Sequence, residues 1–245
     1  MRWSERVVRS GWALALLVAG AAAPAAGETD RDRALARCAG ETGQRLRFLE
    51  SRLDGHARYA DLWWKGWTGV FAGGIVVSGV RAGFEGDRGE RADLVVTAAK
   101  SAIGLARNLW APPPARLGAR ELAGMPTDTA DGCARRLARA EEILHRNVED
   151  AREGRRSWIP HVANLALNLA GALIVAEGFD EADGWTSGAL GFAVGEARIW
   201  SHPWQAGGTL AEYRRRFPAS GVPQAPATSW HLESWGAGAR VTVRY

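Results

Sequence analysis

An internal repeat is the feature that most constrains what this chain can fold into. Residues 33–122 can be laid over residues 128–213 with an offset of 95 positions. The pairs that this offset brings together are Cys38 with Cys133, Trp63 with Trp158, Val80 with Val175, and Gly83-Phe84 with Gly178-Phe179. The chain has 2 cysteines, and both fall on one equivalence, so this register outweighs a match of common apolar residues.

A second block of matches follows at the shorter offset of 91, as expected if the second copy lacks a few residues in a loop. It pairs Gly104 with Gly195, Arg107 with Arg198, Pro112 with Pro203, and Glu121 with Glu212. We therefore predict a mainly α-helical, internally duplicated bundle with a pseudo-twofold axis. Copy one covers residues 29–122 and copy two residues 127–213.

Each copy contains three parts in the same order, and we predict one helix for each part. A charged segment with apolar residues at helical spacing comes first, an apolar segment second, and a segment rich in small residues third. These segments are 29–60, 62–82 and 93–110 in copy one, and 128–156, 158–176 and 185–200 in copy two.

Residues 1–27 have the pattern of an export signal. Three arginines precede an apolar run from Gly11 to Ala23, and small residues follow up to Gly27. Without this segment the chain keeps 28 basic and 26 acidic side chains, a net charge of +2. Such a balance does not favour nucleic-acid binding, which needs clustered, unopposed basic residues. We expect a periplasmic or peripherally envelope-associated protein with residues 28–217 as its helical domain.

Residues 218–245 differ in composition from the helical domain. The stretch 218–228 is rich in Pro, Ala and Gly, which is typical of a linker. Apolar and polar residues then alternate from Arg240 to Tyr245, beyond the turn-forming stretch 235–238. This pattern predicts a small C-terminal β-hairpin.

Cys38 and Cys133 are candidates for a disulfide. They occupy equivalent positions in the two copies, and export would deliver them to an oxidising compartment. We therefore predict that a disulfide links the two copies.

The apolar segments raise the question of a membrane. From Trp64 to Val80 there is a single charge, Lys65, and such a segment can cross most of a ~30 Å hydrocarbon layer. However, the loop from Glu177 to Gly184 carries four acids and no base, although it would lie in the cytoplasm. Because this contradicts the positive-inside tendency, we expect a soluble or peripherally attached bundle. An integral inner-membrane bundle is the alternative.

A polar stripe crosses the apolar segment of the second copy. His161, Asn164 and Asn168 lie at i, i+3 and i+7 on one helix face. Their equivalents in the first copy are three glycines, Gly66, Gly69 and Gly73. We predict that the two apolar helices pack on each other through the glycines, with the amides hydrogen-bonded across the contact.

Together with Lys100 and Glu196, the polar stripe forms our candidate ligand-binding site. The simpler interpretation of these residues is a hydrogen-bonded core network, because an unpaired buried amide costs ~1–3 kcal/mol.

Arg107 and Arg198 occupy equivalent positions near the ends of their helices. Each arginine could cap the terminal carbonyls of its helix or pair with the acid of its own copy, Glu121 or Glu212. We expect this structural pairing in preference to binding an anion.

A pattern of catalytic residues is not evident. The Gly-x-Ser-x-Gly, His-Glu-x-x-His, Cys-x-x-Cys and Walker motifs are missing. We expect a non-catalytic envelope or interaction protein without metal or cofactor, whose partner is an envelope protein or a small ligand. The first alternative is a ligand carrier or enzyme with a pocket between the copies. The second is a membrane-embedded assembly factor, which a continuous apolar girdle would favour.

Overall fold

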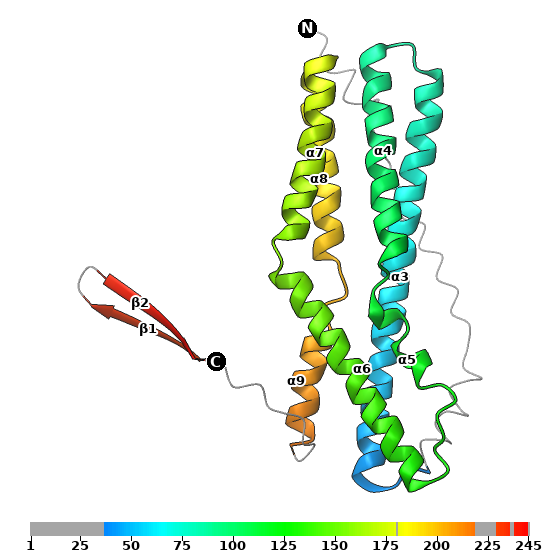
Figure 1. The fold of residues 1–245 in the computed structure, drawn as a ribbon, viewed down its shortest axis with the longest axis vertical. Coiled ribbons are helices and arrows are strands. Elements are labelled where there is room, and N and C mark those ends of the chain that lie inside the picture. The colour runs from blue at the N-terminus through cyan, green and yellow to red at the C-terminus, as the bar shows by residue number, and fades with distance from the viewer. Residues whose placement is uncertain (1–36, 180, 219–228, 236–237, 245) are drawn as a thin grey trace, which may run out of the picture.

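The computed structural model of this chain describes residues 37–179, 181–218, 229–235 and 238–244. The predicted export signal and nearly all of the predicted linker lie outside the described residues. Within them the chain is mainly helical, and the helices form an elongated bundle (Figure 1).

The first half of the bundle is built on one long helix. Helix α3 (Gly40–Phe84) turns back into α4 (Arg88–Trp110), and the two pack side by side. Asp87 begins α4 by accepting a hydrogen bond from the Glu90 N–H at 2.9 Å, as an N-cap does. Two short helices, η1 (Pro114–Arg116) and α5 (Gly118–Glu121), then contact α3.

In the described residues of the second half, the helices are α6 (Ala130–Arg156), α7 (Ile159–Gly178), α8 (Glu181–Trp200) and α9 (Ala206–Arg216). Helices α7 and α8 pack on each other and on α4, whereas α6 and α9 pack on each other and on α3. Figure 1 shows the resulting arrangement, with the α3–α4 and α7–α8 hairpins at one end.

The structure differs from the prediction of two separate helices in the first copy. Segments 29–60 and 62–82 were each expected to be a helix, but one helix runs without a break from Gly40 to Phe84. In the second half the chain does break, and Pro160 lies in the first turn of α7. Proline lacks an N–H, and its ring clashes with the carbonyl four residues earlier. At the offset of 95 the equivalent residue is Lys65, which lets α3 continue.

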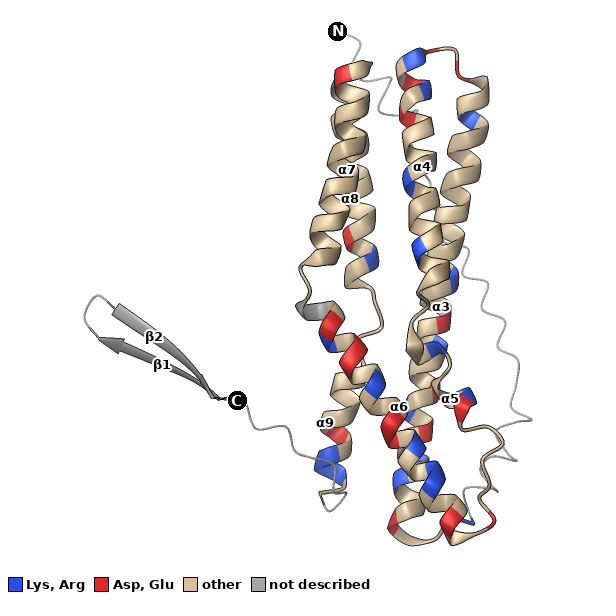
Figure 2. Cartoon of the chain, in the orientation of Figure 1, with Lys and Arg blue, Asp and Glu red and all other residues tan. Residues whose placement is uncertain are grey.

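Charge divides the bundle into two parts (Figure 2). We call residues 38–61, 114–156 and 206–217 the head, and residues 62–110 and 158–200 the apolar part. Most of the charged side chains lie in the head.

The hydrophobic core lies inside the head. Its buried side chains come mainly from α3, α6 and α9, and include Leu46, Leu49, Leu53, Leu122, Ile143, Leu144, Val148, Leu210, Tyr213 and Phe217. The predicted disulfide joins Cys38 to Cys133, whose Cα atoms are 5.8 Å apart. A buried ion pair between Glu50 and Arg136, 2.6 Å apart, also ties α3 to α6.

The described residues of the C-terminal segment include a pair of strands. Strand β1 (Ser229–Trp235) pairs antiparallel with β2 (Gly238–Arg244), and Trp235 lies opposite Gly238.

Candidate functional site

The polar residues predicted on α7 lie on the face that meets α8. Asn164 Nδ2 donates to the Phe192 carbonyl and to Glu196 Oε1, each at 3.0 Å. Asn168 Nδ2 donates to the carbonyl and the side-chain oxygen of Asn164, also at 3.0 Å. His161 Nδ1 lies 2.8 Å from Glu196 Oε2. These four side chains form one hydrogen-bonded row, which we call the polar row.

Lys100 of α4 approaches the other end of the polar row. A Cβ built on Gly191 of α8 would lie 3.2 Å from Lys100 Nζ and would overlap Asn168 Oδ1. The Lys100 ammonium group and the Asn168 amide therefore both lie next to Gly191. The structure thus brings all five predicted site residues together, from helices α4, α7 and α8.

The predicted packing through Gly66, Gly69 and Gly73 is wrong. A Cβ on any of these glycines would meet no neighbouring atom within 4 Å, and α7 packs on α8 and α4 instead. Helix α7 instead packs on a different glycine series, which lies on α8 and consists of Gly184, Gly188, Gly191 and Gly195. Sequence reasoning missed this series, although its alternating spacing of four and three residues marks one helix face.

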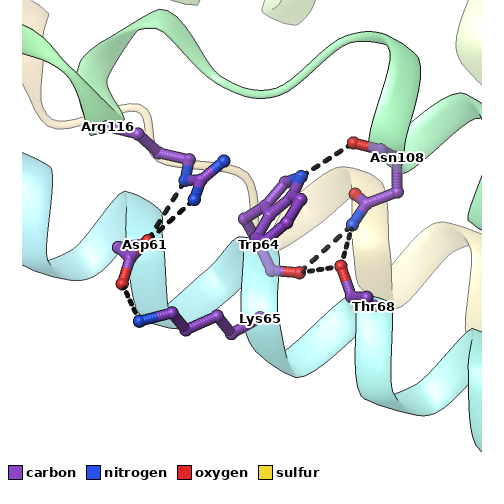
Figure 3. Close-up of polar contacts among 6 residues, drawn as sticks. All are labelled: Asp61, Trp64, Lys65, Thr68, Asn108 and Arg116. Carbon is purple, nitrogen blue, oxygen red and sulfur yellow. Dashed lines mark hydrogen bonds and ion pairs between the residues drawn. The ribbon is translucent and has the colours of Figure 1, made fainter.

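A second polar cluster, also missed, lies where the head meets the apolar part (Figure 3). The Asn108 side chain is fully buried and donates to the Trp64 carbonyl at 3.1 Å and to Thr68 Oγ1 at 2.9 Å. The Trp64 indole N–H donates in return to the Asn108 carbonyl at 2.8 Å. These bonds join α3 to the end of α4. In the sequence, Asn108 stands out as a single amide near the end of an apolar helix, and this could have indicated the cluster.

An ion pair lies beside this cluster, as Figure 3 shows. The Arg116 guanidinium is 2.9 Å from the Asp61 carboxylate and stacks on the Trp64 ring at 3.8 Å. Lys65 contacts the same carboxylate at 2.5 Å. The hydrogen bond from Lys65, and then that from Arg116, lower the pKa of Asp61, although burial opposes the shift. Asp61 is therefore an anion at neutral pH, held between two cations.

Residues 201–205, between α8 and α9, contact α3 beside this cluster. The Ser201 hydroxyl accepts from the indole N–H groups of Trp63 at 3.0 Å and Trp67 at 3.2 Å. The His202 ring packs on the rings of Trp63 and Trp204. Burial, followed by the nearby positive charge of Arg198, lowers the pKa of His202 to about 4, so this imidazole is neutral at pH 7.

The predicted pairing of Arg107 with Glu121 and of Arg198 with Glu212 is wrong. The two acids bind other arginines: Glu121 contacts Arg139 and Arg146, and Glu212 contacts Arg52. Arg198 reaches α4 instead and donates to Asn108 Oδ1 at 3.2 Å.

The head carries an open cavity of about 420 Å³, lined by Gln44, Arg47, Phe48, Ser51, Arg52 and Arg216. None of its lining residues belongs to the polar row. Within the described ranges, no group of three or more His, Cys, Asp or Glu side chains is placed to hold a metal ion.

No protein-family profile, curated protein or solved structure significantly matches this chain. The function must therefore be inferred from the chemistry and the surface of the molecule itself.

Proposed function

We propose that this chain is an integral membrane protein of the cell envelope, whose apolar part spans the bilayer and whose disulfide-linked head lies on the exported side. In this role the head is a non-catalytic interaction domain held at the membrane surface.

The exposed apolar surface is the observation that carries the proposal. Apart from Tyr59 and Leu117, every large hydrophobic residue exposed in the described chain lies within 62–110 or 158–200. Examples are Val70, Val76, Val80, Ile103, Leu165, Leu169, Leu173, Ile174, Leu190 and Val194. An apolar surface of this extent marks an interaction site in water, whereas lipid tails are as apolar as the side chains themselves.

The helix lengths support the same location. Helices α7 and α8 have 20 residues each, which corresponds to about 30 Å and matches a hydrocarbon layer. Helices α3 and α7 are long and apolar enough to cross a membrane. In the most apolar stretch of each, only 6% of the residues in α3 and 22% of those in α7 are buried. A core helix of a water-soluble protein would be mostly covered.

The orientation follows from the disulfide and from the arginines. Disulfides persist in oxidising compartments, so the head belongs outside. The tip of the α3–α4 hairpin then faces the cytoplasm and carries Arg81, Arg88 and Arg91. The positive-inside tendency counts Lys and Arg, gives little weight to acids, and does not hold back long exported domains. The acidic loop at Glu177–Gly184 is therefore compatible with insertion.

We also infer that the two halves of the chain arose by duplication and that its last residues form a hairpin. The similar α3–α4 and α7–α8 helix pairs support the duplication, as does a disulfide between equivalent cysteines. The antiparallel pairing of β1 with β2 supports the hairpin.

Fractionation of bacteria that express the full chain tests the membrane location. We expect the protein to stay in the membrane pellet after both a salt wash and a carbonate wash, because its apolar part is embedded in lipid. Release by salt or carbonate would contradict integral insertion.

Cysteine labelling then tests the orientation. A membrane-impermeant maleimide applied to intact spheroplasts should label Asp128→Cys in the head but not Gly86→Cys at the hairpin tip. The opposite pattern would reverse the orientation and leave insertion intact. The native cysteines are paired and so do not react.

A second candidate function is binding of a small polar ligand at the polar row. Ionisable residues inside a membrane-spanning unit are costly and are commonly functional, and Glu196 and Lys100 both lie in the apolar part. A purely structural row should tolerate His161→Gln, which retains a donor and an acceptor. If the row binds a ligand, His161→Gln should keep the melting temperature but fail to complement a deletion strain.

A further inference from the structure

We propose that Arg107 and Arg198 bind the phosphate of a phospholipid headgroup at the head-side surface of the bilayer. This inference rests on the membrane insertion proposed above.

The surroundings of Arg198 are the first observation. Its guanidinium is held by Asn108 Oδ1 at 3.2 Å and lies 5.0 Å from the Trp63 ring centre. Its Nε is buried and has no hydrogen-bond partner among the described residues. Asn108 is the next residue after Arg107, so Arg198 reaches from α8 to the turn of α4 that carries Arg107.

The second observation concerns the charge balance of these two arginines. Within the described part of the chain, neither Arg107 nor Arg198 forms an ion pair with a carboxylate. The acids expected to neutralise them are bound elsewhere in the head. Because an unpaired, partly buried charge is costly, an anion from outside the chain would stabilise this arrangement.

The depth of the two arginines is the third observation. Trp110 and Trp200 end α4 and α8 and are 92% and 69% exposed, and Trp158 before α7 is 68% exposed. Exposed tryptophans at the ends of spanning helices lie at the membrane–water interface, where the headgroups are. Arg107 and Arg198 lie within one turn of these ends.

The neighbours of Arg107 favour a lipid over free phosphate. Ile103 and Trp110, about one turn away on either side, are exposed and apolar. They offer a surface for acyl chains or the glycerol region, while the guanidinium groups offer paired N–H donors that match phosphate oxygens.

Lipid retention by the purified full chain tests the site. The protein is extracted in a mild non-ionic detergent, and bound phospholipid is measured by native mass spectrometry and by phosphorus assay. We expect the wild type to keep at least one phospholipid per chain. Replacing Arg107 and Arg198 together by Gln should weaken retention roughly tenfold or more, because charge-assisted hydrogen bonds are lost.

If the double variant does not fold, Arg107→Gln alone keeps the test valid. The Arg107 side chain is exposed and makes no hydrogen bond or ion pair with another described residue, so its replacement should not disturb the fold. This variant should still lose several-fold in retention. The matched control is Arg88→Gln at the opposite end of α4, which should retain lipid as the wild type does.

The outcomes separate this inference from the proposed function. A wild-type protein that resists carbonate but retains no phospholipid would overturn the lipid site alone, as would equal retention by all variants. Inorganic phosphate that binds the delipidated protein and displaces added phospholipid at equal concentration would replace the lipid by free phosphate. Release of the wild type by carbonate would overturn both proposals.

Discussion

At the scale of single residues, the glycines of α8 determine how closely α7 approaches. The amides of Asn164 and Asn168 lie over Gly195 and Gly191, in the space that a side chain would occupy. Each amide is thereby held against the α8 backbone, where Asn164 reaches the Phe192 carbonyl. The polar row therefore depends on these glycines as well as on its own polar side chains.

Gly195→Ala should therefore destabilise the protein. The added methyl group would overlap the Asn164 amide, and overpacking of this kind costs ~1–3 kcal/mol. Gly69→Ala on α3 is the matched control, because its Cβ would meet no neighbour. There the more favourable helix propensity of alanine should leave stability equal or raise it by up to ~1 kcal/mol. Melting temperatures in detergent measure both effects, and a similar loss in the two variants would show that the glycine series of α8 is not special.

At the scale of elements, one proline and one disulfide set the geometry of the two halves. Pro160 ends the path of α6 and lets α7 begin in a new direction, whereas α3 passes the same level as a single helix. The Cys38–Cys133 bond joins the start of α3 to the first turn of α6. These two helices contribute most of the head core, so the bond ties together the elements on which the core depends.

Removal of the disulfide should strongly destabilise the head. The bond closes a separation of 95 residues, for which the chain-entropy model gives about 4–5 kcal/mol. Cys38→Ser, Cys133→Ser and the double variant should lower the free energy of unfolding by the same amount. Denaturant unfolding measures this, and reduction of the wild type should reproduce the loss. Unequal effects of the two single variants, or no effect of reduction, would contradict the linkage.

At the scale of the whole molecule, burial and polarity are distributed in opposite ways. The head has charged surfaces and a closed apolar core, as in a protein dissolved in water. The apolar part has apolar surfaces, and its polar row faces inward between helices. In the proposed membrane orientation the head would face water and the apolar part lipid, and the cluster around Asn108 and the tryptophans would lie at the boundary between them.

The helical class and the disulfide were predictable from the sequence, which also singled out the five polar side chains that lie near one another between α4, α7 and α8. That these side chains bind a ligand stays a prediction. Helical periodicity is local, the 2 cysteines allow one intramolecular pairing, and polar side chains are conspicuous within apolar helices. The choice of packing face was not predictable. Gly66, Gly69 and Gly73 have nearly the same spacing as the glycines of α8, yet only the α8 series meets a neighbour. A helix sequence specifies which residues share a face, but whether protein covers that face depends on where the other helices lie, and only the tertiary structure decides this.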